Sequence, residues 1–206
     1  MLIVATSAEI ELLKELRMRE YLTTVRWLKE NAAGHPVVFI ECVTQAGSFI
    51  ENDFPVHYAG CHDPTYRNKG ASLGRSLRQF FSTCEVADSL VLQITGRYHF
   101  LDRSFVSAVE NNPGYDFYGR EIDEIYGAGL RERRKQYFTG AFAMRTELLR
   151  DWLNETDFQH LETHMINIER CLWQYVERQR LSAYHVDCVR MDCNVFGNGR
   201  PDQVVF

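Results

Sequence analysis

The sequence has no long apolar run and no excess of positive charge. No stretch of its 206 residues is apolar for the length that a bilayer requires, and the opening Met-Leu-Ile-Val-Ala carries no basic region of the secretory type. Lys and Arg number 23 against 28 Asp and Glu, for a net charge of −5. This balance argues against nucleic acid or an anionic membrane as the main partner. We expect a cytoplasmic protein without a transmembrane segment, and the sequence leaves its oligomeric state open.

Closely paired cysteines, linkers and repeats are also missing. No Cys-x-x-Cys pair occurs, so reduced thiols in a reducing compartment are favoured over a zinc site or a disulfide framework. No stretch is rich enough in Gly, Ser or Pro to divide the chain, and no repeat or low-complexity segment is present. The 45% hydrophobic and 25% charged residues are typical of globular proteins. We expect a single domain over residues 1–206, or one domain of a larger polypeptide. The six cysteines are at positions 42, 61, 84, 171, 188 and 193.

The most informative stretch is the apolar run from Leu90 to Ile94 and the polar triplet that follows it. Four of its five residues are apolar and two are β-branched, which predicts a strand buried on both faces of a mostly parallel sheet. Ligands of open α/β sheets bind outside the carboxyl ends of the strands, and Thr95-Gly96-Arg97 stands at this end. The triplet is either part of a binding site or a plain turn with a surface cation.

Another buried strand is predicted at the start of the chain, from Leu2 to Ala5. Thr6-Ser7-Ala8-Glu9 has the Thr-x-x-Glu spacing of a capping box, so the strand is expected to give way to a long helix at Thr6 and Ser7. In α/β proteins that bind nucleotides, the loop after the first strand often meets the ligand. Thr6 and Ser7 are therefore candidates either for helix capping alone or for contact with a nucleotide.

A candidate anion site follows two more strands, predicted at Val37–Val43 and Val56–Tyr58. Asn68-Lys69-Gly70 stands immediately before a helix with Leu73, Leu77, Phe80 and Phe81 on one face. Backbone amides at this helix start, together with the Lys69 ammonium, could hold a diphosphate. The alternative is a solvated loop that happens to contain a lysine.

Beyond residue 110 the sequence gives weaker signals for secondary structure and for site residues. Gly140 follows Thr139 in an apolar segment, where the backbone could approach a ligand closely. Glu162 and Glu169 lie on one flank of a predicted helix, a position that most often faces solvent. The elements predicted here are a strand at Asp116–Gly119, a solvated charged face at Arg120–Gln136, an apolar segment at Tyr137–Arg145, a short helix capped by Thr146, a long helix at Phe158–Glu177 and a strand at Tyr184–Val189.

This order of elements, together with Ile94-Thr95-Gly96-Arg97-Tyr98, resembles the small nucleotide-sugar glycosyltransferases of the GT-A fold. The likeness is to members with an Ile-Thr-Gly-Arg-Tyr signature that build capsular or lipopolysaccharide glycans, and to domains of large algal viruses that decorate capsid protein. It covers roughly Leu2 to Val189. The resemblance implies a single-domain, Rossmann-like α/β fold with a mixed, mostly parallel central sheet flanked by helices. A viral member would work in the host cytoplasm.

The resemblance also implies a donor site. In the wider GT-A group, an Asp-x-Asp motif at the end of the strand equivalent to Leu90–Ile94 holds a divalent metal against the donor diphosphate. Here Thr95-Gly96-Arg97 occupies that place, and Arg97 with Lys69 could bind the phosphate oxygens instead. Mn²⁺ or Mg²⁺ held by other groups, such as Asp102, His185 or Asp187, stays open. The implied donor-binding residues are Thr6, Ser7, Lys69, Gly70, Thr95, Gly96, Arg97, Thr139 and Gly140.

Inverting GT-A enzymes use an acidic residue at the start of a later helix as the base that accepts the proton of the acceptor hydroxyl. By position, Glu162 resembles that base and Arg97 the group that stabilises the leaving diphosphate. His164, Asp116 or Asp157 could take the role of base instead.

The expected function is transfer of a hexose or deoxyhexose, with inversion, from a nucleoside diphosphate sugar to a carbohydrate or glycoprotein acceptor. A uridine diphosphate sugar is the expected donor. A retaining transferase or nucleotidyltransferase on the same sheet is one alternative. A noncatalytic nucleotide- or carbohydrate-binding module is another.

Overall fold

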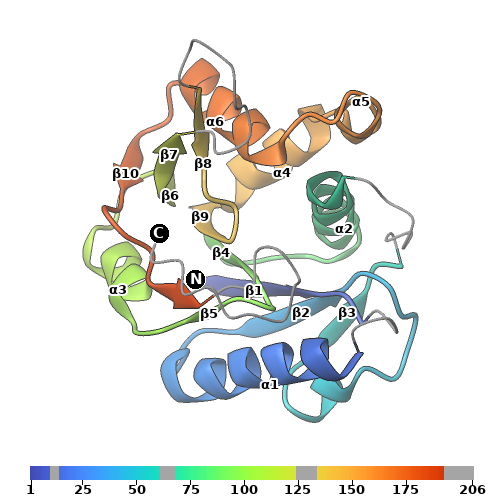
Figure 1. The fold of residues 1–206 in the computed structure, drawn as a ribbon. Coiled ribbons are helices and arrows are strands. Elements are labelled where there is room, and N and C mark those ends of the chain that lie inside the picture. Colours follow the sequence, from blue (N-terminus) through green and yellow to red (C-terminus); the bar gives the residue numbers. More distant parts are fainter. Residues whose placement is uncertain (10–13, 61–67, 124–133, 193–206) are drawn as a thin grey trace.

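A computed structural model describes residues 1–9, 14–60, 68–123 and 134–192. Its central sheet has seven strands in the order β10-β6-β9-β4-β1-β2-β3 (Figure 1). Neighbouring strands pair in parallel except at β9, which runs antiparallel to both β4 and β6. The mixed, mostly parallel sheet predicted from the sequence is therefore confirmed. The strands are β1 Leu2–Ser7, β2 Val37–Glu41, β3 Val56–Tyr58, β4 Leu90–Thr95, β6 Phe117–Gly119, β9 Ala141–Arg145 and β10 Ala183–His185.

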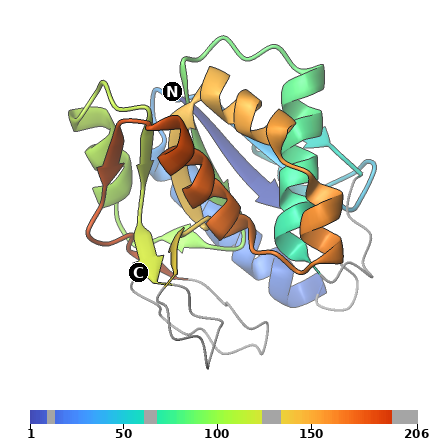
Figure 2. The same cartoon turned by 90° about the horizontal axis from the view of Figure 1, so that it is seen from above.

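Helices cover both faces of this sheet. One core cluster packs α1, α3 and the 3-10 helix η2 against one face, and a second packs α2, α4, α5 and α6 against the other. Figure 2 looks onto the layer of α2, α4 and α6, with α1 behind the strands. Two small antiparallel pairs, β5 with β11 and β7 with β8, lie outside the main sheet. The bounds are α1 Lys14–Asn31, η2 Phe49–Asn52, α2 Lys69–Thr83, β5 His99–Phe100, α3 Ser104–Asn111, β7 Glu121–Asp123, β8 Lys135–Tyr137, α4 Thr146–Glu155, α5 Phe158–Thr163, α6 Ile168–Gln179 and β11 Met191–Asp192.

The central strands are apolar along their length because both faces are buried. In β1, Ile3 and Ala5 join the cluster on the α1 side, whereas Leu2 and Val4 join the cluster on the α2 side. This alternation follows from the two-residue period of a strand. All six residues of β1 are buried, as expected for an interior parallel strand.

The predicted capping box at the end of the first strand is wrong. Thr6 and Ser7 are the last residues of β1, where Thr6 lies opposite Thr95 of β4 and Ser7 lies opposite Glu41 of β2. Sheet pairing on both sides extends the strand by two polar residues that an apolar pattern does not include. The two side chains therefore lie at the carboxyl end of an interior strand rather than at a helix start.

The single long helix predicted over Phe158–Glu177 is also wrong, because the chain forms two helices there. Between α5 and α6 it turns through Met165, a residue that has a φ of +52° and is 59% exposed. The regular spacing of Leu161, Met165, Ile168 and Leu172 in the sequence predicts one helix with Met165 on its apolar face. The break places Glu169 in the first turn of α6.

Other boundaries move by a few residues. Asn68 caps α2, so Lys69 and Gly70 lie in its first turn, and α4 begins at Thr146 itself. The charged stretch predicted as a solvated face carries β7 and β8 at its two ends, and its residues 124–133 lie outside the described residues. Residues 184–189, predicted as one strand, hold only the end of β10.

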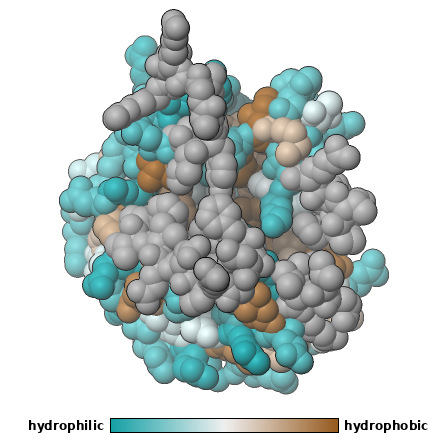
Figure 3. Space-filling view, viewed as in Figure 1, coloured by the Kyte–Doolittle hydropathy of each residue, from teal (hydrophilic) through white to brown (hydrophobic). Residues whose placement is uncertain are grey.

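The surface is mostly hydrophilic, as the composition of a globular protein predicts. In the view of Figure 3, hydrophilic residues cover most of the coloured surface, and hydrophobic residues form separate small areas. Of the cysteines, Cys42, Cys84, Cys171 and Cys188 are not in disulfides, and the other two lie outside the described part of the chain. Within that described part, no helix has both the length and the apolarity that crossing a membrane requires.

Gly96 allows the end of β4 to approach β1. Its amide donates to the Thr6 carbonyl at 2.8 Å, and an added Cβ would lie 2.6 Å from that same oxygen. We expect Gly96→Ala to destabilise the fold by about 1–3 kcal/mol, because a backbone atom cannot move aside as a side chain can. Urea unfolding would measure this, and a loss below about 0.5 kcal/mol, the range of neutral surface changes, would contradict the close approach.

Candidate active site

A pocket of about 280 Å³ opens at the carboxyl ends of β1 and β4. The first turn of α2, the segment between β8 and β9 and the start of α6 complete its walls. Eight of the nine residues predicted from the resemblance to bind the donor line it. These are Thr6, Ser7, Lys69, Gly70, Thr95, Arg97, Thr139 and Gly140.

Backbone hydrogen bonds join the strand ends beneath this pocket. The Gly96 amide donates to Thr6 of β1, and the Thr95 amide donates to the Gly140 carbonyl at 2.9 Å. Gly96, the ninth predicted residue, is thus a backbone link below the pocket and not part of its lining. These bonds fix Thr95 and Arg97 relative to three strands at once.

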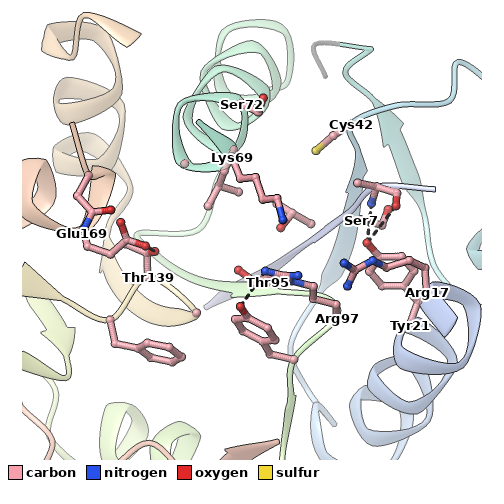
Figure 4. Close-up of a pocket in the computed structure, with 18 of the residues that line it drawn as sticks. Ser7, Arg17, Tyr21, Cys42, Lys69, Ser72, Thr95, Arg97, Thr139 and Glu169 are labelled. Atoms are coloured by element: carbon pink, nitrogen blue, oxygen red, sulfur yellow. Dashed lines mark hydrogen bonds between the residues drawn. The ribbon is translucent and has the colours of Figure 1, made fainter. Parts of the chain in front are cut away.

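Two cations reach the middle of the pocket. Figure 4 shows Lys69 extending from α2 and Arg97 from the turn after β4, with Ser7, Arg17 and Tyr21 on one side and Thr139 and Glu169 on the other. Burial lowers the pKa of Lys69, and the nearby positive charges of Arg97 and Arg17 lower it further. Like charges held this close favour the binding of an anion between them.

Aromatic side chains hold Arg97 in place. Its Nη2 donates to the Tyr98 hydroxyl at 2.9 Å, and its guanidinium carbon lies 4.8 Å from the centre of the Tyr98 ring. The Tyr98 ring in turn stacks on Phe138 at 6.4 Å between centroids. Across the described residues, no carboxylate forms a salt bridge with Arg97. Within the described part of the chain, no acidic side chain therefore neutralises its charge.

One end of the pocket, formed by Ser7, Arg17 and Tyr21, is held by hydrogen bonds. The Tyr21 hydroxyl accepts from the Ala8 amide at 2.8 Å and donates to the Ala8 carbonyl at 3.3 Å, which ties α1 to the end of β1. Arg17, although only 6% exposed, forms an ion pair with Glu20 at 2.7 Å. We call this the Tyr21 end.

The Ser7 hydroxyl is oriented by a buried carboxylate. Ser7 Oγ donates to Glu41 Oε2 at 2.6 Å, and Glu41 Oε1 accepts from the amides of Glu9, Val43 and Thr44 at 3.1, 2.9 and 3.1 Å. Four donors satisfy this fully buried carboxylate. Because the only hydroxyl hydrogen of Ser7 is used, its oxygen could act toward a ligand only as an acceptor.

Glu169 lies at the opposite end, in the first turn of α6. The Thr139 hydroxyl donates to Glu169 Oε1 at 2.8 Å, and both side chains line the pocket. Burial raises the pKa of Glu169 above its usual value, although the Thr139 hydrogen bond opposes the shift. A desolvated carboxylate with a raised pKa is suited to accept a proton. We call this the Glu169 end.

Asn68 connects the two helix starts that flank the pocket. Its Oδ1 accepts from the Ala71 amide at 3.2 Å and so caps α2. Its Nδ2 donates to the carbonyls of Leu161 and Ile166 at 3.0 and 2.9 Å, on either side of the turn between α5 and α6. One side chain therefore fixes the helix start that carries Lys69 relative to the turn that leads to Glu169.

Gly70 makes the close packing of these helices possible. A Cβ at Gly70 would lie 2.5 Å from Cγ2 of Ile168, the first residue of α6. Any larger residue would push the two helix starts apart. Gly70 thus lines the pocket and also sets its width.

Glu162, predicted as the catalytic base, lies outside the residues that line the pocket. It is in α5 and forms an ion pair with Arg75 at 2.6 Å. The alternative bases do not line the pocket either. Asp157 caps α5, His164 follows the end of that helix, and Asp116 bonds Ser182 and Arg145.

The predicted metal candidates do not form a common site. Asp102 pairs with Arg190 at 2.7 Å, and His185 lies 3.0 Å from the Tyr137 hydroxyl. Neither residue lines the pocket, and the exposed Asp187 does not line it either. Across the described part of the chain, no three His, Cys, Asp or Glu side chains gather as metal ligands would.

Sequence reasoning missed several lining residues, Arg17, Tyr21, Gln136, Asn167 and Glu169 among them. For Glu169 a signal existed, because Asn167 is a residue type that often caps helices and stands two positions before it. Read as a helix start, Asn167 would have placed Glu169, rather than Glu162, at the beginning of the later helix. Arg17 and Tyr21 were missed because the sequence pattern over α1 indicates only an amphipathic helix and not which of its residues reach a pocket.

No protein-family model matches the chain, and no curated protein matches it either. Solved structures do match. A nucleoside-diphosphate-sugar pyrophosphorylase from Vibrio cholerae has a TM-score of 0.55 and 11% identity over 90% of this chain and 91% of its own. Mouse xyloside xylosyltransferase 1 has a TM-score of 0.54 and 11% identity over 90% of this chain and 84% of its own.

The bifunctional IspDF of Campylobacter jejuni also matches, with a TM-score of 0.55 and 11% identity over 90% of this chain. The chain spans only 48% of that protein. At these identities the likeness concerns the fold, and the narrower Ile-Thr-Gly-Arg-Tyr group stays a prediction. The chain has the fold of the nucleotide-diphospho-sugar transferases.

Proposed function

We propose that this chain is a glycosyltransferase that moves a sugar from a nucleoside diphosphate to a hydroxyl of a glycan. The observation that carries the proposal is the order of groups along one pocket. Lys69 and Arg97 lie in the middle, and Glu169 lies at one end. This order matches the order of charges in the reaction, a diphosphate leaving group beside a hydroxyl that must lose a proton.

The diphosphate would lie between Lys69 and Arg97. Both side chains point into the same space, and the positive charge of Arg97 adds to burial in lowering the pKa of Lys69. A bound anion would relieve this repulsion. As the sugar leaves, negative charge grows on the diphosphate, and cations already in place stabilise it without rearrangement. The nucleoside would then occupy the Tyr21 end.

The sugar would lie between the diphosphate and Glu169. The acceptor oxygen attacks the anomeric carbon, the bond from that carbon to the phosphate oxygen breaks, and its electron pair leaves with the diphosphate. The hydroxyl proton passes to the Glu169 carboxylate. We place the base at Glu169 rather than Glu162 because Glu169 lines the pocket and Glu162 is held by Arg75.

The finer details follow the resemblance stated above. A uridine diphosphate hexose or deoxyhexose is the proposed donor, with inversion at the anomeric carbon and a carbohydrate or glycoprotein acceptor. Inversion requires the base and the leaving group on opposite sides of the sugar. The positions of Glu169 and of the two cations at different parts of the pocket support that arrangement.

Nucleotidyl transfer is the second candidate. It is favoured by the match to the Vibrio cholerae pyrophosphorylase, which this chain covers over 91% of its length. The two reactions differ in their products. A glycosyltransferase releases a nucleoside diphosphate from a nucleotide sugar, whereas a nucleotidyltransferase joins a nucleoside triphosphate to a sugar phosphate and releases pyrophosphate.

Nucleotide binding tests the charge arrangement directly. We expect Arg97→Ala and Lys69→Ala each to weaken binding of uridine diphosphate by about tenfold or more, since a charge-assisted hydrogen bond contributes about 1.5–3 kcal/mol. Arg26→Ala is the matched control, because Arg26 is exposed on α1 and does not line the pocket. Calorimetric titration, with and without Mn²⁺, gives the dissociation constants.

Unchanged affinity for uridine diphosphate in both Arg97→Ala and Lys69→Ala would contradict binding of the diphosphate in this pocket. Binding without turnover of any nucleotide sugar would favour the binding module. Pyrophosphate release from a nucleoside triphosphate and a sugar phosphate would favour the nucleotidyltransferase.

A further inference from the structure

Two amide side chains face each other at the Glu169 end of the pocket. Asn167 Nδ2 donates to Gln136 Oε1 at 3.1 Å, and both residues line the pocket. Gln136 is only 3% exposed, which is unusual for a glutamine unless its polar atoms are used. Asn167 stands at the cap position of α6 but makes no side-chain capping bond.

Their mutual hydrogen bond leaves part of each amide unused. Gln136 keeps its NH₂ group as a donor, and Asn167 keeps its carbonyl oxygen as an acceptor. If both amides are flipped, the roles exchange and the pair still offers one donor group and one acceptor. The property therefore does not depend on how the amide atoms are assigned.

An apolar side chain stands beside this pair. Ile122 of β7 is the direct cross-strand partner of Gln136 of β8, so the two side chains share one face of the small sheet. Both line the pocket, as does the Phe138 ring two residues beyond Gln136. The Glu169 end thus presents a hydrogen-bond donor, an acceptor and an apolar surface side by side.

We propose that this corner binds the acetamido group of an N-acetylated sugar. An acetamido group offers a carbonyl acceptor, an N–H donor and a methyl group, which are the complements of the three features just described. A pair of vicinal hydroxyls would satisfy the amides but would leave Ile122 facing polar atoms. The inference rests on the proposed function, which places a sugar at this end.

The acetamido group can belong to the donor sugar or to the acceptor, and the experiment separates the two. Uridine diphosphate N-acetylglucosamine and uridine diphosphate glucose, which differ only at the second carbon, are titrated into the protein. The methyl glycosides of N-acetylglucosamine and glucose are titrated with uridine diphosphate present and without it. We expect one of these pairs to show at least about tenfold tighter binding for the acetamido member.

Two variants connect that preference to the named residues. Gln136→Leu keeps a similar volume and removes the amide, and Ile122→Ala removes the surface for the methyl group. Each should reduce the preference to about threefold or less while leaving the affinity for uridine diphosphate alone unchanged. Gln174→Leu, an exposed position on α6, is the matched control and should keep the full preference.

Equal binding of the acetamido and hydroxyl members in every pair would overturn the inference, even if uridine diphosphate binds well. Loss of uridine diphosphate affinity in Gln136→Leu would also overturn it, because Gln136 would then contact the nucleotide. The proposed function fails separately, when neither the nucleotide nor any nucleotide sugar binds. The glycosides titrated without nucleotide still test the acetamido corner in that case.

Discussion

Glu169→Gln is expected to lower the rate of sugar transfer by about 10²–10⁴-fold while nucleoside diphosphate binding is kept. The amide preserves the shape and can still accept the Thr139 hydrogen bond, but it cannot take up the acceptor proton. Single-turnover measurements with a nucleotide sugar would give the chemical rate. Glu162→Gln is the matched control, and a loss of rate in that variant with none in Glu169→Gln would return the base to α5.

The same substitution has an opposite expected effect on stability. Because burial raises the pKa of Glu169 in the folded chain, folding favours its protonated form. That contribution is fully present below the unfolded pKa and is lost as the pH rises through the folded value. At pH 7 the native carboxylate is therefore destabilising, and Glu169→Gln should raise the melting temperature at pH 7 but not at pH 4.

The pH dependence of activity in the native chain should report the titration of Glu169. A base with a raised pKa is protonated at a higher pH than an ordinary glutamate, so the acid limb of kcat/KM should lie above the usual glutamate range. A melting temperature that Glu169→Gln leaves unchanged at both pH values would contradict the buried environment of this carboxylate.

Asn68→Asp is expected to cause the largest combined loss of stability and activity. Aspartate can still cap α2, but it replaces the Nδ2 donor with an oxygen that faces the carbonyls of Leu161 and Ile166. Two lost hydrogen bonds and a new repulsion should cost about 2–4 kcal/mol. Misplacement of Lys69 relative to Glu169 by even 1 Å could lower kcat/KM by about 10²-fold.

Asn112→Asp provides the matched control for this substitution. The Asn112 amide donates to the Ala108 carbonyl at 2.8 Å at the end of α3, away from the pocket. Denaturant unfolding and steady-state kinetics would be measured for both variants. Equal effects in the two would show that Asn68 is an ordinary helix-end residue and does not position the site.

The parts of the site that sequence could predict are those at strand ends. Leu90–Ile94 and Leu2–Ala5 are recognisable as buried strands, and the polar residues that follow parallel strands meet at one edge of the sheet. The resemblance to glycosyltransferases predicts that Thr6, Ser7, Thr95 and Arg97 belong to one donor site together with Thr139 and Gly140, and the meeting of the strand ends is the physical reason that these residues line one pocket.

The parts that sequence could not predict depend on contacts between distant elements. Whether Glu162 or Glu169 reaches the pocket is decided by the turn at Met165, whose left-handed backbone no apolar pattern reveals. For Thr6 and Ser7 the local Thr-x-x-Glu spacing also indicates helix capping, which is one of the two roles that the sequence leaves open. Pairing with β2 and β4 overrides that spacing.

The arrangement of the central sheet also bears on how the chain folds. β1 lies between β2 and β4, and β4 lies between β1 and β9, so the innermost strands pair with segments far away in the sequence. Non-local pairings of this kind form slowly, since long loops must close before they yield contacts. During synthesis from the amino terminus, β1 and α2 emerge long before α6. Because Asn68 bonds the carbonyls of Leu161 and Ile166 and Gly70 packs against Ile168, the start of α2 is held in place only after these residues have emerged, and the pocket is completed late in synthesis.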